Sequence, residues 1–134
     1  MTGNKRQTTT TKTPYTNTFN HSLLSTLYAF RSSRSIRNKY NINVHSISVL
    51  IACYYYSVAV NPVFSVNQLS IFYTIYSYYR TKKYLILLDS IGLITQRGLN
   101  KYSMTDSGIA AINEISHNSE SLIYEFCNKY NLEL

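Results

Sequence analysis

The sequence predicts a mainly helical single domain of about six helices that carries one small β-hairpin. Three observations predict this fold class. Apolar residues recur at helical spacing through most of the 134 residues. Near Gly92 that spacing gives way to two short strand-like runs separated by turn residues. Directly afterwards, Thr105 and Asp106 have the character of a new helix start.

The first segment, residues 1–18, lacks apolar periodicity and is rich in threonine, which predicts a flexible basic arm. Its cations, Lys5, Arg6 and Lys12, could follow a phosphate backbone or the minor groove. An inert tail is the alternative, since terminal segments are commonly inert. The folded domain is therefore expected over residues 19–134.

A first helix is expected to begin at a cap formed by Asn20 or Ser22 and to end near Lys39. Its apolar side comprises Leu23, Leu24, Leu27 and Phe30. A row of cations at every third position comprises Arg31, Arg34 and Arg37. This row is either a phosphate-binding face or a solvated helix face.

A second helix is expected from His45 to about Ala59, and Asn61 with Pro62 ends it. Its core-facing stripe comprises Ile47, Leu50, Ile51, Tyr54 and Val58. Its outward-facing side chains comprise Tyr55 and Tyr56. His45 fits a capping or surface histidine better than a metal ligand.

A short third helix is expected from Asn67 to about Tyr73, capped by Ser65 or Asn67. Its inward side chains are Leu69 and Phe72. Residues 74–76 would then form a turn, and Ser77 would cap the next helix.

That next helix is expected to end at Gly92, which suits the position just past a helix C-terminus. Its inner side comprises Thr81, Tyr84, Leu85, Leu88 and Ile91. Its outer side carries Tyr79 and Lys83, with Arg80 and Lys82 on the flanks. Cations for phosphates and long polar side chains for base edges are typical of a helix that enters the DNA major groove. A solvated basic helix is the alternative.

The strand-like runs are Leu93–Arg97 and Lys101–Met104. Gly98 and Asn100 tolerate the backbone angles of a tight hairpin between them. The cations beside the turn, Arg97 and Lys101, could contact phosphate or the minor groove.

Two further helices are expected after the hairpin. The first, from Thr105 to about Ser116, would pack Ile109, Ile112 and Ile115. The second would be capped by Ser119. Its apolar stripe comprises Leu122, Ile123, Phe126 and Tyr130.

The order helix, GLITQR, hairpin, YSMTDSG, helix resembles the winged helix-turn-helix regulators of the MarR (multiple antibiotic resistance regulator) family. The matching residues are Gly92-Leu93-Ile94 and Met104-Thr105-Asp106-Ser107-Gly108. The family's acidic-and-arginine wing signature is missing here, and the wing is shortened to Gly98-Leu99-Asn100. The resemblance implies that residues 63–65 add a strand to the wing sheet. It also implies that the first and last helices pair two copies into a homodimer.

Charge is distributed unevenly along the chain. Ten Lys and Arg residues and no acid precede Asp89, giving +10, whereas the remainder carries three cations against six acids, giving −3; together these make the net charge of +7. This asymmetry favours a polyanionic partner for the first two-thirds of the chain. Cys53 and Cys127 lack metal-ligand spacing, and no apolar run is long enough to span a bilayer, so a reducing cytoplasm is expected. The three histidines have no nearby Cys or carboxylate partners, which argues against an enzyme, a metal site or a cofactor.

The sequence therefore predicts a dimeric transcriptional regulator that binds double-stranded DNA. The expected DNA-contacting residues are Ser77, Tyr79, Arg80, Lys82, Lys83, Arg97, Lys101, Arg31 and Arg34. Tyr79, Arg80 and Lys83 would contact base edges. One alternative is a phage- or mobile-element-encoded winged-helix scaffold for protein assembly, favoured by the outward tyrosines, Ile86 and the short wing. Another is single-stranded nucleic acid stacked on Tyr78 and Tyr79.

Overall fold

The computed structural model describes residues 21–132, so the expected arm at residues 1–18 lies outside the described residues. Within them the chain is mainly helical, with one small antiparallel sheet. In chain order the elements are α1 (His21–Ser32), α2 (Arg34–Tyr40), α3 (Val44–Ala59), β1 (Val63–Ser65), α4 (Val66–Phe72), α5 (Tyr78–Ser90), β2 (Ile94–Gly98), β3 (Lys101–Met104) and α6 (Asp106–Tyr130).

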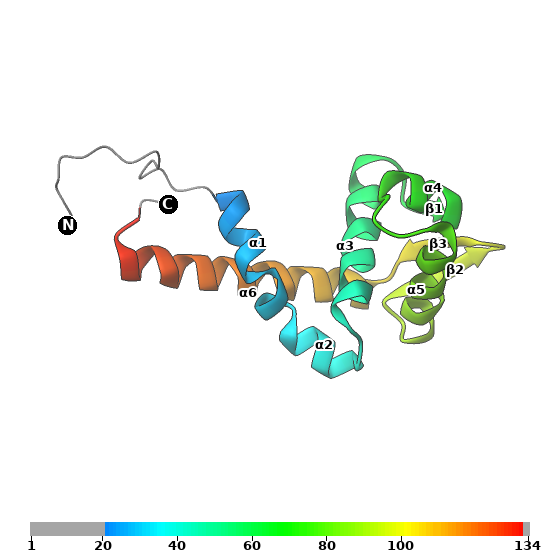
Figure 1. Ribbon diagram of the computed structural model, residues 1–134. Helices are drawn as coiled ribbons and strands as arrows, with labels where there is room; N and C mark the ends of the chain where they lie inside the picture. Colours follow the sequence, from blue (N-terminus) through cyan, green and yellow to red (C-terminus); the bar gives the residue numbers. More distant parts are fainter. Residues whose placement is uncertain (1–20, 133–134) are drawn as a thin grey trace.

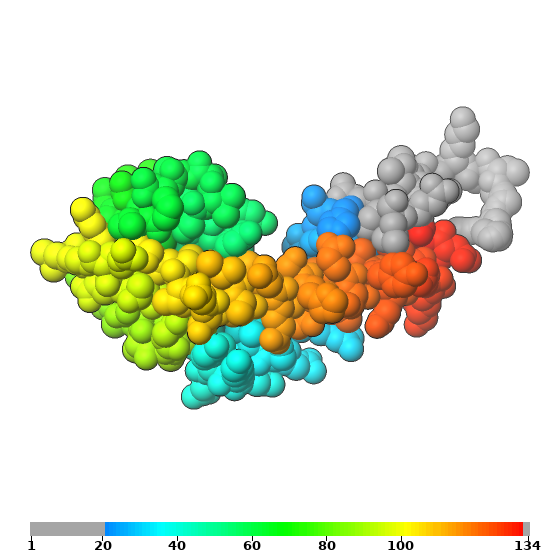
Figure 2. Space-filling model, turned by 180° about the vertical axis from the view of Figure 1, so that it is seen from behind, coloured from blue at the N-terminus to red at the C-terminus, as the bar shows by residue number. Residues whose placement is uncertain are grey.

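The molecule is elongated, and α6 runs along most of its length (Figure 1). At one end, α3, α4 and α5 gather with the three strands around the main core. Toward the other end, α1 packs on α6 (Figure 1). A hydrogen bond from Asn118 Nδ2 to the Ser32 carbonyl oxygen, 3.3 Å, and a contact of 3.0 Å between His21 Nε2 and Glu120 Oε1 join these two helices. The space-filling view from behind shows α6 as a continuous ridge across the molecule (Figure 2).

Four helices begin at a side chain that accepts a hydrogen bond from a backbone N–H three residues later, which satisfies one of the free donors of the first turn. The capping residues are Asn43, Ser65, Ser77 and Thr105. Ser77 and Thr105 were expected in this role, and Ser65 was one of the two candidates for α4. Ser65 also forms a capping box, since the Gln68 side chain accepts from the Ser65 N–H. Asn43 caps α3, so His45 is not a cap, and its side chain is exposed.

The sheet has the strand order β1-β3-β2, and both pairings are antiparallel. The β2–β3 hairpin turns through Leu99 and Asn100, and the register shifts between Gln96 and Gly98. Gly98 has a φ of 148° and Asn100 a φ of 56°, so both take the positive backbone angles that the sequence predicted. The strand at residues 63–65 is present as β1, beside β3.

The core lies where α3, α5 and the sheet meet. Its fully buried side chains include Leu50 of α3, Phe64 of β1, Leu69 of α4, Leu85 and Leu88 of α5, and Ile94 of β2. These side chains come from five elements, which together supply the buried hydrophobic area that stabilises this end of the molecule.

Two expected helix boundaries are wrong. The predicted first helix is broken at Ser33, where the Ser33 hydroxyl donates to the Phe30 carbonyl oxygen and accepts from Arg37 Nε, 3.0 Å each. A buried serine that bonds to its own helix backbone competes with the next helical turn. At the other end, the two predicted C-terminal helices form the single helix α6. No Gly or Pro interrupts residues 116–119, so the polar residues there continue the helix instead of restarting it.

Several side chains lie on the opposite side from the one expected. Tyr56 is buried at 6% exposure, whereas Val58 is 68% exposed. The aromatic ring of Phe72 contacts Tyr56 edge-on, but Phe72 itself is 43% exposed. Ile109 is 41% exposed. The predicted apolar side of α1 is also largely solvent-exposed, at Leu23, Leu27 and Phe30. In each case the packing of elements that are distant in sequence decides whether the side chain is covered. Helical spacing gives no information about that packing.

Candidate nucleic-acid interface

Helix α5 is held in place by its inner side. Thr81, Tyr84, Leu85 and Leu88 are all buried, as the sequence predicted, and Ile91 just beyond the helix is half-buried. The inner side packs on α3 and α4, and the end of α5 leads directly into β2. Ser77 Oγ accepts from the Arg80 N–H at 3.3 Å, so its role is to fix the first turn of α5. These contacts fix which side of α5 is left for a partner.

The outer side of α5 is a continuous exposed row of side chains, which we call the α5 ridge. It comprises Tyr79, Lys83, Ile86 and Ser90. These positions lie within about 60° of one another around the helix and span about 16 Å along it. Tyr79 is 81% exposed and Ile86 51% exposed. Lys82 flanks the ridge and is half-buried.

Arg80 lies differently from the prediction that it faces outward toward base edges. Its Nη2 donates to the Tyr84 hydroxyl at 3.0 Å, and its guanidinium carbon lies 4.9 Å from the centre of the Tyr76 ring. Tyr76 in turn is hydrogen-bonded through its hydroxyl to His45 Nδ1 at 2.7 Å. The arginine side chain, although exposed, therefore lies along an aromatic cluster of the protein itself.

The β2–β3 hairpin follows α5 directly, and a backbone contact couples the two. The Gln96 N–H donates to Asp89 Oδ1 at 3.2 Å, which ties the middle of β2 to the end of α5. Arg97 is exposed and donates from Nη1 to Ser103 Oγ at 3.2 Å. Lys101 is exposed, and Leu99 at the hairpin tip is 86% exposed. Arg97 and Lys101 thus place two cations on the hairpin that directly follows α5.

Asp89 is the only acidic residue within α5. Its side chain is half-buried, and its carboxylate accepts a hydrogen bond from the Gln96 N–H. Burial, and then the negative charge of Asp89, raise the pKa of the Tyr102 hydroxyl, so that group stays protonated at neutral pH.

The two remaining predicted contacts lie elsewhere. Arg31 lies in the last turn of α1 and Arg34 begins α2, and both are exposed. Helix α2 packs chiefly on α1 and α6, and α3 stands between it and α5 (Figure 1). The structure therefore places the α5 and hairpin residues on consecutive elements that pack on each other, whereas Arg31 and Arg34 lie on α1 and α2, apart from them within one chain.

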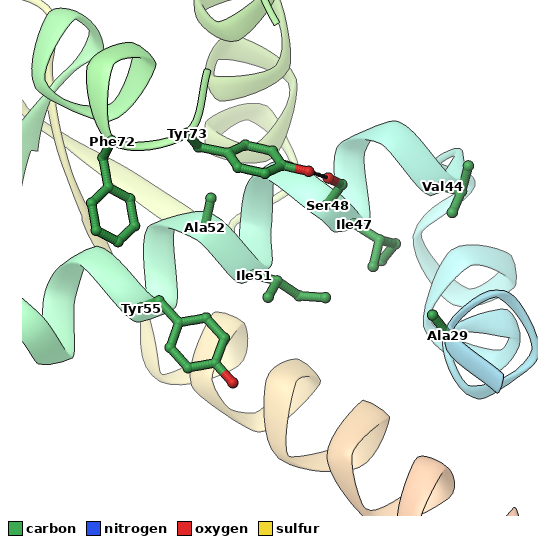
Figure 3. A pocket seen from close by; sticks show the side chains of 9 residues that line it. All are labelled: Ala29, Val44, Ile47, Ser48, Ile51, Ala52, Tyr55, Phe72 and Tyr73. Atoms are coloured by element: carbon green, nitrogen blue, oxygen red, sulfur yellow. Dashed lines mark hydrogen bonds between the residues drawn. The ribbon is translucent and has the colours of Figure 1, made fainter. Parts of the chain in front are cut away.

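A second surface feature is an apolar groove of about 440 Å³ on the side of α3. Its floor comes from α3, one wall from Ala29 of α1, and the other from Phe72 and Tyr73 beside α4 (Figure 3). The only hydrogen bond drawn there joins the hydroxyls of Ser48 and Tyr73 (Figure 3). No charged side chain lines it, so the groove and the basic α5 ridge have different chemistry.

Across residues 21–132, no three His, Cys, Asp or Glu side chains are grouped to hold a metal ion. Burial raises the pKa of the Cys53 thiol far above its ordinary range, so this residue is not a reactive thiolate. In the same part of the chain no single helix has the length and hydropathy of a membrane span; only α1–α2 taken together with α3, bent by 101°, meets that criterion.

Comparison of the chain with protein-family models, with curated proteins and with solved structures gave no match. The likeness to MarR regulators therefore depends on the quoted motif residues alone.

Proposed function

We propose that this protein is a winged helix-turn-helix regulator of transcription that binds double-stranded DNA. In this proposal α4 and α5 form the helix-turn-helix, α5 enters the major groove, and the β2–β3 hairpin is the wing. The observation that carries it is the joint exposure of Lys83 on the α5 ridge and of Arg97 and Lys101 on the adjoining hairpin, beside Lys82. Duplex DNA is the polyanion whose groove accepts a helix flanked by such cations.

We further propose that two copies act together. Exposed apolar side chains remain on α1 and α6 after the chain has folded: Leu27 at 66%, Phe30 at 57%, Tyr124 at 55% and Tyr130 at 54%. A second copy would cover them. It would also place a second α5 on the duplex, where half-sites one helical turn apart require a spacing of about 34 Å.

The test is the salt dependence of binding to a random-sequence duplex, measured by fluorescence anisotropy at about 50 and 200 mM salt. If Lys82, Arg97 and Lys101 each neutralise one phosphate, the slope of log K against log salt is about −2.7 per protomer. Affinity then falls by about 40-fold between the two salt concentrations.

Matched variants locate the contact. Lys101→Ala on the hairpin should reduce the magnitude of the slope by about one unit. Lys129→Ala removes a cation from the last turn of α6, away from α5, and should leave the slope unchanged. An absence of salt-sensitive binding by the wild-type chain at micromolar concentration would refute duplex binding.

A protein-assembly role is the second candidate, because one apolar surface fits neither DNA nor the α1–α6 pairing. Its side chains come from α3, the following loop, α4 and the turn before α5, and comprise Tyr55, Val58, Val60, Ile71 and Ile75, each at least 58% exposed. Where exposed apolar side chains form a patch, they mark protein contacts in many folds. The same titration separates the candidates, since an assembly scaffold would show no steep salt dependence on DNA.

A further inference from the structure

Of the side chains that read purines through two hydrogen bonds at once, the α5 ridge carries one, Lys83. Bidentate reading of guanine uses arginine or lysine, and of adenine uses asparagine or glutamine. Tyr79, Lys83, Ile86 and Ser90 include no arginine and no amide, so Lys83 is the only strong donor on the ridge.

The single arginine of α5 is occupied elsewhere. Arg80 donates to Tyr84, which is 5% exposed, and covers Tyr76, which is 8% exposed. Turning this guanidinium toward a base would break a hydrogen bond and a cation–π contact. These contacts therefore hold Arg80 away from the role of binding guanine, which arginine would otherwise perform best.

What the ridge does present is apolar surface on both sides of one ammonium group. The Tyr79 ring is the most exposed aromatic side chain on α5, and Ile86 exposes half of its surface. The apolar group on base edges in the major groove is the C5 methyl of thymine. Tyr79 and Ile86 are seven residues apart, or about 10.5 Å along the helix, which corresponds to about three base steps at 3.4 Å.

We propose that α5 selects duplex DNA by contacting thymine methyl groups through Tyr79 and Ile86, about three base pairs apart, with Lys83 donating to an acceptor between them. This inference rests on the proposed duplex binding. It assigns the ligand class as thymine-containing duplex and assigns Arg80 to holding the aromatic cluster together.

The experiment compares two A·T duplexes of about 24 base pairs, long enough for two half-sites one turn apart. One contains thymine and the other contains uracil at every thymine position. The two probes have equal phosphate charge and differ only in the methyl group. We expect the full chain to bind the thymine duplex about 3- to 5-fold more tightly for each methyl contacted.

Variants assign that preference to residues. Tyr79→Ala and Ile86→Ala should each reduce the thymine preference while keeping the salt slope. Tyr55→Ala, which removes an exposed tyrosine of α3, should keep both. Arg80→Ala should keep the thymine preference, and circular dichroism would report whether the aromatic cluster still folds.

The outcomes separate the two proposals. Equal affinity for both duplexes with a normal salt slope would overturn methyl reading and leave duplex binding intact. Failure to bind either duplex would overturn duplex binding itself. Loss of the thymine preference in a folded Arg80→Ala variant would show that the arginine, and not the apolar ridge, contacts the bases.

Discussion

Helices α5 and α1 look alike in sequence but differ in the folded chain. Both carry apolar residues at helical spacing, and each carries positive charge, three cations in α5 and Arg31 in the last turn of α1. In α5 the apolar side is covered, and Leu85 and Leu88 have no exposed surface. In α1 the corresponding positions remain open, and Leu27 is 66% exposed. Helical spacing thus identifies residues that share a face, but the covering of that face depends on other elements.

The physical difference is the number of neighbours that each helix has. Helix α5 is enclosed by α3, α4 and β2, which approach it from different sides. Helix α1 packs mainly on α6, partly through an edge-on contact of Tyr28 with Phe126, with ring centres 6.2 Å apart. One partner helix covers only one stripe, so the remaining apolar side of α1 stays available for a second copy of the chain.

The largest expected effect tests how tightly the α5 end is packed. A Cβ on Gly108 would lie 2.0 Å from the backbone oxygen of Leu93, so α6 would have to move away from the start of β2. We expect Gly108→Ala to lower the free energy of unfolding by about 3 kcal/mol or more in urea titrations. The adjacent exposed Ser107→Ala should change it by about 0.5 kcal/mol or less. Equal stability of the two variants would contradict the close approach of α6 and β2.

The second effect measures burial on α5 itself. Leu85→Ala leaves a cavity in the core and should lower the free energy of unfolding by about 2–5 kcal/mol. Its neighbour Ile86 lies on the exposed ridge, so Ile86→Ala should cost about 0.5 kcal/mol or less. Similar losses at the two positions would mean that α5 is rotated from the orientation described.

The third effect concerns pH and the interior next to α5. Cys53 of α3 is fully buried, and desolvation raises the pKa of its thiol in the folded chain. Above pH about 8.5 the unfolded chain releases this proton and the folded chain keeps it, so stability is retained below that pH and falls as pH rises. The expected loss is up to about 2 kcal/mol by pH 10.

Urea titrations between about pH 8 and pH 10 check this effect; the tyrosines begin to titrate in the same range but contribute equally to the wild type and to the control variant. Cys53→Ala is the control, and its free energy of unfolding should lack this part of the pH dependence. The same slope in the wild type and the variant would show that water reaches the thiol.

The smallest effect on stability tests the open side of α1. Leu27→Ala should change the free energy of unfolding of the monomer by about 0.5 kcal/mol or less. If a second copy covers this side, the dissociation constant of the dimer should rise by about 5- to 10-fold in sedimentation experiments. Val58→Ala, equally exposed on α3, should leave the association unchanged. The opposite ranking of the two variants would move the interface to α3 and α4.

Local features of the fold were predictable because each depends on a few neighbouring residues. The caps at Ser77 and Thr105 need only a hydroxyl and the next helical turn. The hairpin needs Gly98 and Asn100, which tolerate positive φ. The buried side of α5 was also predicted correctly, because other elements enclose that helix and cover its apolar stripe.

Features that depend on distant contacts were not predictable. At the break between α1 and α2, the Ser32 carbonyl oxygen accepts from Asn118 of α6, 86 residues away in the sequence. The burial of Tyr56 depends on the aromatic rings of Phe64 and Phe72, contributed by β1 and α4.

By itself the sequence determined the type and order of most elements, the capping residues and the concentration of positive charge before residue 89, since these follow from local backbone preferences and composition. Only the tertiary structure decided which residues a partner can reach. It turned Arg80 onto Tyr84 and left Tyr79 and Ile86 outermost on α5. The physical reason is that the direction of a long side chain is set by the groups packed around it, and the aromatic cluster that holds Arg80 is itself packed against His45 of α3, from another part of the chain.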